Sequence, residues 1–404
     1  MGARGRIAAL ALLTACGEPA MMEAPVGMGG QAGTVIRVAT FNVALYRDAP
    51  GELLRDLQQG DNRQLASVQA IIRRVDPDIL VLNEFDYDAS GEALALFARQ
   101  LEAGYAHHLA IPSNTGVASG FDLDGDGRSD HPMGARAYGN DSFGYGTHPG
   151  QYAFAVLSRF PLDTDSIRTF QTFLWKDLPD NLLPTEFYAR DVQEVFRLSS
   201  KNHADVPVMV GDETLHLVLA HPTPPGFDGP EDRNGRRNHD EVRLLLDYVT
   251  RADAAWIVDD QGRRGGLDAG AMFVIAGDLN ADPADGDRPA GQARHAIAEL
   301  IGHPRVTDPK PKSFGGLDAA RRQGKANARH DGDPALDTAD FSDDRAGNLR
   351  VDYVLPSSNL DVRGSGVFWP ADDEPGFELV GPGFPPVSSD HRLVWVDIAL
   401  PGGD

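Results

Sequence analysis

A short apolar run that ends in polar residues constrains the fold of this chain more than any other feature. Residues 272–276 read Met-Phe-Val-Ile-Ala without a polar interruption, and Gly277 then ends the run. This length and composition predict a strand with both faces covered, as in a layered α/β protein. Asp278 and Asn280 follow two residues apart, so the strand period sends both side chains to the same side.

The pair formed by Asp278 and Asn280 suits hydrolysis. The carboxylate can take a proton from water, and the amide can hold that water or an anionic oxygen beside it. A plain turn is the alternative interpretation, because Gly, Asp and Asn are also the commonest turn residues. The choice between the two depends on polar residues elsewhere in the chain.

Other apolar segments also carry polar side chains at their ends. The segments are 35–43, 78–83, 215–220, 350–355 and 393–398, and the residues are Asn42, Glu84, His221, Asp352, Asp390 and His391. Glu84 directly follows a buried strand, which favours a ligand for a hard cation over a surface ion pair. Asp352 lies inside its strand and therefore needs a buried partner. Asn42, His221 and the Asp390-His391 pair are each also compatible with a structural role, as a turn residue, a packed histidine and a capping turn.

Helical spacing separates these segments, with apolar residues three or four apart at 65–75 and 94–101. Asn238 and Glu241 resemble a capping box that would open a further helix. Residues 194–200 are predicted to be extended. Residues 112–150, 171–191 and 309–349 are predicted to be long loops, which in compact domains are often functional.

Two groups of charged residues in these regions allow a functional and a structural interpretation. Arg197, Lys201 and His203 gather cationic side chains in an acidic chain, as either a phosphate clamp or solvated charge. The 112–150 loop holds acidic residues at the first, third, fifth and ninth positions of an EF-hand-like pattern, namely Asp122, Asp124, Asp126 and Asp130. No glutamate stands at the twelfth position, so both a structural Ca²⁺ site and a solvated turn remain open.

The N-terminus predicts export. Arg4 and Arg6 precede the apolar run 7–12, and small residues then lead to Cys16, the single cysteine, which excludes an internal disulfide. The run is too short to span a bilayer, so residues 1–15 are interpreted as a signal peptide. The Leu-Thr-Ala-Cys ending resembles the lipobox of bacterial lipoproteins. Lipidation of Cys16 would anchor the chain to a membrane through a flexible tether at 16–33. An ordinary signal peptide is the alternative.

The six polar strand ends occur in the order TFNV, LNE, LAHP, GDLN, RVDYVL and SDH. This order resembles that of the endonuclease/exonuclease/phosphatase family, the DNase I-like proteins. The resemblance implies one domain over about 34–402, folded as a four-layer α/β sandwich of two facing mixed β-sheets flanked by helices. It also implies hydrolysis of a P–O bond with a divalent metal, usually Mg²⁺, with Mn²⁺ or Ca²⁺ as substitutes.

The resemblance also implies a role for each matched residue. Glu84 would be the principal metal ligand, supported by Asn42 and Asp390. Asp278 would activate the attacking water, with the Asn280 amide beside it. His391 would contact the scissile phosphate, oriented by Asp352, and His221 would stabilise the transition state or assist the leaving group.

The substrate is left open by the sequence. A net charge of −23 disfavours long-range attraction to nucleic acid, but a bound divalent cation reverses the local field. The phosphate ester could belong to a nucleic acid, a nucleotide, a phospholipid headgroup or a sugar phosphate. We expect a monomer without a protein partner. The alternative function is a non-catalytic calcium-binding surface lipoprotein on the same scaffold, which predicts gaps in the polar set, and the sequence shows none.

Overall fold

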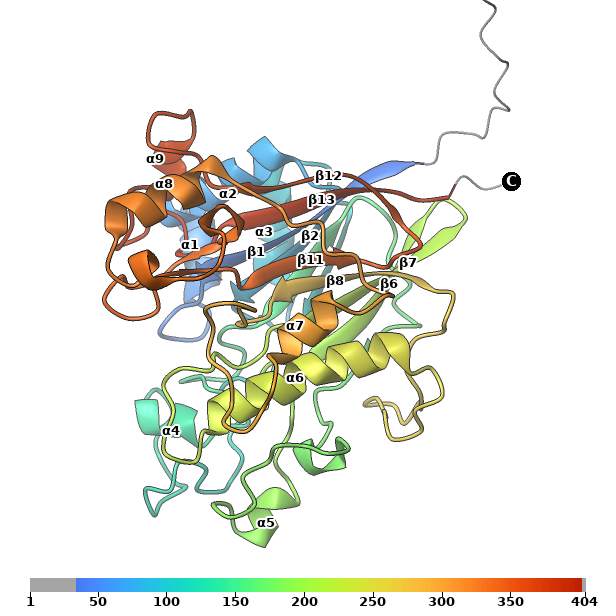
Figure 1. Cartoon of the computed structure of the whole chain (residues 1–404), viewed down its shortest axis with the longest axis vertical. Coiled ribbons are helices and arrows are strands. Elements are labelled where there is room, and N and C mark those ends of the chain that lie inside the picture. The colour runs from blue at the N-terminus through green and yellow to red at the C-terminus, as the bar shows by residue number, and fades with distance from the viewer. Residues whose placement is uncertain (1–33, 402–404) are drawn as a thin grey trace, which may run out of the picture. The chain divides into compact units, whose positions relative to one another are not determined.

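The computed structural model describes residues 34–401, which form two β-sheets packed face to face with helices on both outer sides (Figure 1). The predicted signal peptide at 1–15, the tether at 16–33 and the lipidation site at Cys16 lie outside the described residues. Among residues 34–401, no helix is both long and apolar enough to cross a bilayer.

The first sheet has six strands in the spatial order β12-β13-β1-β2-β4-β3. Their bounds are Asp361–Phe368, Leu393–Ala399, Val35–Leu45, Ile79–Phe85, Phe154–Ser158 and His107–Ile111, in that order. β1 and β2 are parallel, whereas every other neighbouring pair is antiparallel. Because Asn42 is in register with Asn83, the polar ends of β1 and β2 lie at the same edge.

The second sheet has five strands in the order β11-β8-β7-β6-β5. Their bounds are Asp352–Pro356, Met272–Asp278, Glu213–Ala220, His203–Val210 and Arg168–Thr169. β7 and β8 are parallel and the other pairs antiparallel. Asp352 pairs directly with Asp278 in this sheet, which brings two acids from distant parts of the chain together.

Helices cover the outer face of each sheet. The six-stranded sheet packs with α1 (Glu52–Gln59), α2 (Arg63–Val75) and α3 (Glu92–Leu101), and the five-stranded sheet with α6 (Arg233–Thr250) and α7 (Ala296–Ile301). Figure 1 shows α6 running along the face of the five-stranded sheet. The remaining elements lie in the connections: α4 (Arg136–Asn140), α5 (Arg190–Gln193), α8 (Phe314–Gln323), α9 (Phe377–Val380), the two-stranded sheet of β9 (Ala339–Asp340) and β10 (Asn348–Leu349), and 3₁₀ turns at Trp175–Asp177, Asn327–Arg329 and Pro334–Leu336.

The side chains of β8 show why its sequence is apolar without alternation. Val274 and Ala276 belong to the core between the two sheets, while Phe273 and Ile275 belong to the core under α6. Successive strand residues point to opposite faces, and here both faces are covered, so each position must be apolar. The predicted fold class, two facing mixed sheets flanked by helices, is confirmed.

Two local predictions are wrong. Residues 194–200 form no strand, and α5 ends just before them. The capping box at Asn238 and Glu241 is not a helix start, because α6 begins at Arg233 and both side chains are buried inside it. Their hydrogen bonds go to other segments, since Glu241 accepts from the backbone N–H groups of Ser200 and Thr223, both at 2.6 Å. The roles of these two residues therefore depend on their tertiary partners. The local sequence pattern gives no sign of those partners.

Candidate active site

The polar ends of strands from both sheets meet in one place. The six-stranded sheet contributes Asn42, Glu84, Asp390 and His391, and the five-stranded sheet contributes His221, Asp278, Asn280 and Asp352. A pocket with a volume of about 1520 Å³ opens there, and its wall includes Glu84, Asp278, Asn280, Asp390 and His391. Asn42, His221 and Asp352 are buried and contact the wall residues from behind.

Asp278 lies at the centre of this group and is 1% exposed. Its Oδ2 accepts a hydrogen bond from Asn42 Nδ2 at 3.0 Å, and its Oδ1 accepts from the Asn280 backbone N–H at 2.9 Å. His221 Nε2 lies 3.4 Å and His391 Nε2 3.7 Å from Oδ2. Burial alone would raise the pKa of Asp278, but the positive His391 and the hydrogen bonds from His221 and Asn42 hold it below its usual range. Asp278 is thus ionised at neutral pH, as a proton acceptor requires.

His391 is held in the charged form. Its Nδ1 lies 2.9 Å from Asp352 Oδ2, which also accepts from Thr338 Oγ1 at 2.8 Å. Although burial lowers the pKa of an imidazole, the neighbouring Asp352 and Asp278 carboxylates raise the pKa of His391 well above its usual range. Burial in turn raises the pKa of Asp352 to about 6, against the effect of His391. Because Nδ1 is fixed by Asp352, Nε2 is the nitrogen that faces Asp278 and the pocket.

Glu84 is a buried carboxylate with a second acid, Asp390, nearby. Burial, followed by the nearby Asp390, raises its pKa to about 7. Its backbone is left-handed, with φ 56°, a conformation that is costly for a non-glycine residue and is concentrated at functional sites. A divalent cation between the carboxylates of Glu84 and Asp390 would remove this repulsion, and both are hard oxygen donors. The residues therefore fit the metal that the sequence predicts.

A second set of close ligand atoms belongs to Asp278, Asp352 and His391, whose oxygen and nitrogen atoms all lie within 4.8 Å of one another. These three groups already satisfy one another, because His391 lies between the two carboxylates and carries the compensating positive charge. A metal here would have to displace that charge. Glu84 and Asp390 therefore fit a metal better than this group does, and the Asp278 group fits proton chemistry.

His221 has the opposite electrostatics from His391. Burial and the positive charge of Lys201 lower its pKa to about 4, so its imidazole is neutral near pH 7. Its Nδ1 is buried and has no hydrogen-bond partner within residues 34–401. A neutral imidazole has one N–H donor and one acceptor nitrogen, so His221 can form hydrogen bonds with groups beside Asp278.

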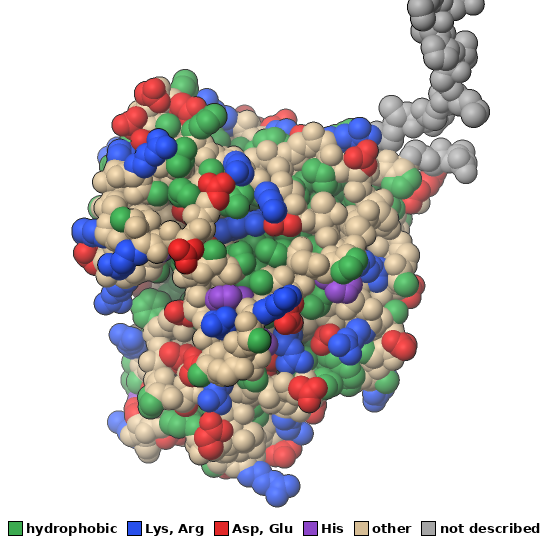
Figure 2. Space-filling view, in the orientation of Figure 1, with side chains coloured by type: hydrophobic (Ala, Val, Ile, Leu, Met, Phe, Trp, Pro, Cys, Tyr) green, Lys and Arg blue, Asp and Glu red, His purple; other side chains and the backbone are tan. Residues whose placement is uncertain are grey.

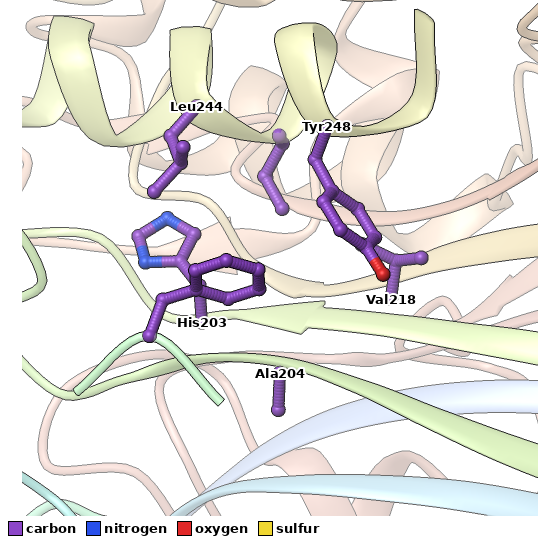
Figure 3. Close-up of a pocket in the computed structure, with 7 residues that line it drawn as sticks. His203, Ala204, Val218, Leu244 and Tyr248 are labelled. Atoms are coloured by element: carbon purple, nitrogen blue, oxygen red, sulfur yellow. The ribbon is translucent and has the colours of Figure 1, made fainter. Parts of the chain in front are cut away.

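The three predicted phosphate-binding cations are separated by the fold. Lys201 is buried behind the site, where Nζ donates to the Pro222 carbonyl at 3.3 Å and burial lowers its pKa. Arg197 donates to Asn114 Oδ1 at 2.6 Å and stacks on Phe143. His203 lines a different cavity, between α6 and strands β6 and β7, which Figure 3 shows. Of the three, Lys201 is the one whose positive charge lowers the pKa of His221.

The rim of the pocket mixes charge and aromatic surface. Exposed Phe227 and Phe384 lie at its mouth, and Tyr46 stacks on Tyr152 at 4.5 Å. The basic wall residues are Lys325, Arg329 and Arg345, and the acidic ones beyond the catalytic group are Asp282, Asp285, Asp287, Asp340, Asp343 and Asp344. Figure 2 shows acidic and basic side chains interspersed on the face of residues 34–401 that it displays. Because acidic residues outnumber basic ones in the wall, the pocket attracts cations and repels anions.

Several residues that support the site were missed by the sequence analysis. Asn238 Nδ2 donates to the carbonyls of Thr223 and Leu279 at 2.9 and 3.0 Å, which fixes the segments that follow β7 and β8. Asn83 Oδ1 accepts from the Asp278 backbone N–H at 3.3 Å. Asn83 directly precedes Glu84 at a strand end, so its position was a usable signal. Thr338, by contrast, lies in a stretch without any periodicity.

Comparisons with known proteins give a family match and similar solved structures. The sequence model described as the Endonuclease/Exonuclease/phosphatase family matches residues 39–391. A comparison with curated protein sequences gives no match. Among solved structures, the chain is similar to an endonuclease/exonuclease/phosphatase from Beutenbergia cavernae DSM 12333, with 20% identity over 91% of this chain and 72% of that chain and a TM-score of 0.49. It is also similar to sphingomyelinase C from Streptomyces griseocarneus, with 14% identity over 90% and 99% of the two chains and a TM-score of 0.44.

Proposed function

This chain belongs to the Endonuclease/Exonuclease/phosphatase family, and from that premise we propose that it hydrolyses a phosphate ester by attack of water with the aid of Mg²⁺. The observation that carries the proposal is the ionised Asp278 in the pocket wall, 3.7 Å from a positively charged His391. A base for water and a cation for phosphoryl oxygens thus lie side by side. The family is divalent-metal dependent, and Glu84 and Asp390 would hold the ion.

Each of these residues has a separate role in the proposed hydrolysis. Asp278 accepts a proton from the attacking water, and the Asn280 side chain, 3.3 Å from Asp278 Oδ2, positions that water. His391 donates from Nε2 to an oxygen that gains negative charge in the transition state. The neutral His221 donates a hydrogen bond to the leaving-group oxygen, which takes its proton from solvent water. A divalent metal held by Glu84 and Asp390 would supply positive charge to the phosphoryl oxygens.

The surroundings of the site support a small or flexible ester group rather than a long duplex. The pocket wall carries many carboxylates besides a few basic residues, and aromatic side chains stand at its mouth. Phosphodiesters and phosphomonoesters of nucleotides, phospholipid headgroups or sugars remain the substrate classes. We further propose that the protein acts outside the cytoplasm, as a lipoprotein anchored at Cys16, on the strength of its N-terminal sequence.

The proposal is tested by parallel assays on bis-p-nitrophenyl phosphate, p-nitrophenyl phosphate and plasmid DNA. Each assay contains Mg²⁺, Mn²⁺ or Ca²⁺, with EDTA as the control, and the purified variants Asp278→Ala and Glu84→Gln exclude contaminating hydrolases. We expect hydrolysis of at least one substrate by the wild type only, and only with metal. Inactivity with every substrate and metal would favour the non-catalytic scaffold.

A further inference from the structure

A second cluster of carboxylates lies in the 112–150 loop, outside the wall of the active-site pocket. Asp122, Asp124 and Asp141 bring oxygen atoms within 4.8 Å of one another. Asp122 and Asp124 belong to the Asp/Gly-rich turn, whereas Asp141 follows the short helix α4. Within residues 34–401, no Lys or Arg forms an ion pair with any of the three. No lysine or arginine of the described residues therefore neutralises their negative charge.

Asp141 distinguishes this cluster from a solvated acidic turn. Its side chain is 7% exposed, and its Oδ1 accepts from the Leu123 backbone N–H at 2.8 Å. Its Oδ2 is buried and has no hydrogen-bond partner among the described residues, and His131 Nε2 lies 3.6 Å away. Burial raises the pKa of Asp141, and the neighbouring Asp124 and Asp122 add to that effect. A buried carboxylate oxygen without a partner is costly unless something binds it.

The chemistry of the cluster selects the occupant. All its donors are carboxylate oxygens, which suit a hard cation, and their loop setting suits the flexible coordination of Ca²⁺ better than the strict octahedron of Mg²⁺. Asp126 stands beside the cluster, with Oδ2 at 3.0 Å from His131 Nε2, and could add a fourth carboxylate. We propose that Asp122, Asp124 and Asp141 form a structural Ca²⁺ site that is separate from the catalytic metal.

The assignment differs from the one that the sequence pattern predicts. Asp130, the ninth residue of the EF-hand-like pattern, is exposed and pairs with Arg128 at 3.0 Å instead of joining the cluster. Asp141 takes its place from eleven residues further along the chain.

The site would join the loop to the rest of the domain. Leu123, between the two turn ligands, is buried, and its carbonyl accepts from Tyr188 Oη and from Arg233 Nη1, each at 3.2 Å. Tyr188 belongs to the 171–191 loop and Arg233 to the first turn of α6. Bound Ca²⁺ would therefore fix the contact between two long loops and α6, which is a stabilising and not a catalytic function.

The experiment measures Ca²⁺ binding by equilibrium dialysis and calorimetry in the Glu84→Gln background, which lacks the principal ligand of the catalytic metal. We expect one Ca²⁺ per chain and a rise in melting temperature on Ca²⁺ addition. In the same background, Asp141→Asn should weaken Ca²⁺ binding at least tenfold, while the matched control Asp130→Asn should bind as the parent does. Asp124→Asn serves as a second test in case Asp141→Asn fails to fold, and should also weaken binding at least tenfold.

Two results would overturn the proposal. One is the absence of bound Ca²⁺ in the Glu84→Gln protein at about 1 mM free Ca²⁺, the weak end of the range for extracellular sites. The other is equal binding by Asp124→Asn and Asp130→Asn. Neither result bears on the hydrolase, because the catalytic assays depend on Glu84 and Asp278 and are carried out on the wild type.

Discussion

Replacing Glu84 by glutamine should stabilise the metal-free protein although it removes the principal metal ligand. In the folded protein the pKa of Glu84 is raised from 4.5 to about 7, first by burial and then by Asp390. The folded state therefore binds more protons than the unfolded state between these values, so stability falls as the pH rises through this window. A shift of this size corresponds to at most about 3 kcal/mol in the free energy of unfolding. The wild type loses this stability by about pH 8, whereas the Glu84→Gln variant keeps it because glutamine stays neutral.

The assay is calorimetric unfolding in EDTA at about pH 5 and about pH 8. For a domain of this size each kcal/mol corresponds to roughly 1–2 °C, so Glu84→Gln should melt about 3–6 °C above wild type at the higher pH. Near pH 5, where Glu84 of the folded protein is mostly protonated, the difference should fall to about 1 kcal/mol or less, roughly 1–2 °C. Glu299→Gln, an exposed carboxylate on α7, is the matched control and should change neither value. A Glu84→Gln protein that is no more stable than wild type at about pH 8 would refute the reasoning.

The remaining predictions concern catalysis. Asp278→Ala and His391→Ala should each lower kcat by about 10²–10⁴-fold with an unchanged circular dichroism spectrum, because each removes a proton-transfer or charge-stabilising group. Near wild-type turnover in either variant would make the assignment wrong. Asp352→Asn should lower the pKa of His391, since Asp352 raises it, so the loss of activity relative to wild type should grow as the pH rises; a loss that is independent of pH would indicate a merely structural role. The Mg²⁺ concentration for half-maximal activity should decrease as the pH rises from about 6 to about 8, because Glu84 must lose its proton to bind metal. A half-maximal concentration that stays constant over that range would argue against Glu84 as the ligand.

The strand ends that form the site could be predicted because their signal is local. Asp278 and Asn280, like Glu84, follow an unbroken apolar run. Such a run indicates a buried strand, and the residue after it indicates a polar group at the edge of the sheet. Buried carboxylates are costly, so a polar residue in such a place has a partner or a function. The order of these strand ends then resembled that of a known family, and the resemblance implied the fold.

The residues that support the site could not be predicted, because their roles depend on segments far away in the chain. Glu241 holds the backbone at Ser200 and Thr223 from inside α6, where a local pattern suggested a capping residue. His203 stood close to Lys201 in the sequence but lies in another cavity, because its ring nitrogens contact Ser199 Oγ and the Glu241 carbonyl. The loop ligand Asp141 has no pattern of its own. Tertiary contacts alone bring such residues into place.

The most direct test of the central claim is anomalous diffraction from crystals of the protein soaked with Mn²⁺. The account predicts a peak within about 2–2.6 Å of a Glu84 carboxylate oxygen, the range of hard-cation coordination distances, with Asp390 beside it. It also predicts that Asp278 and His391 keep their mutual contact in the presence of the ion. A peak bound only by Asp278, Asp352 and His391, or no peak near Glu84, would contradict it.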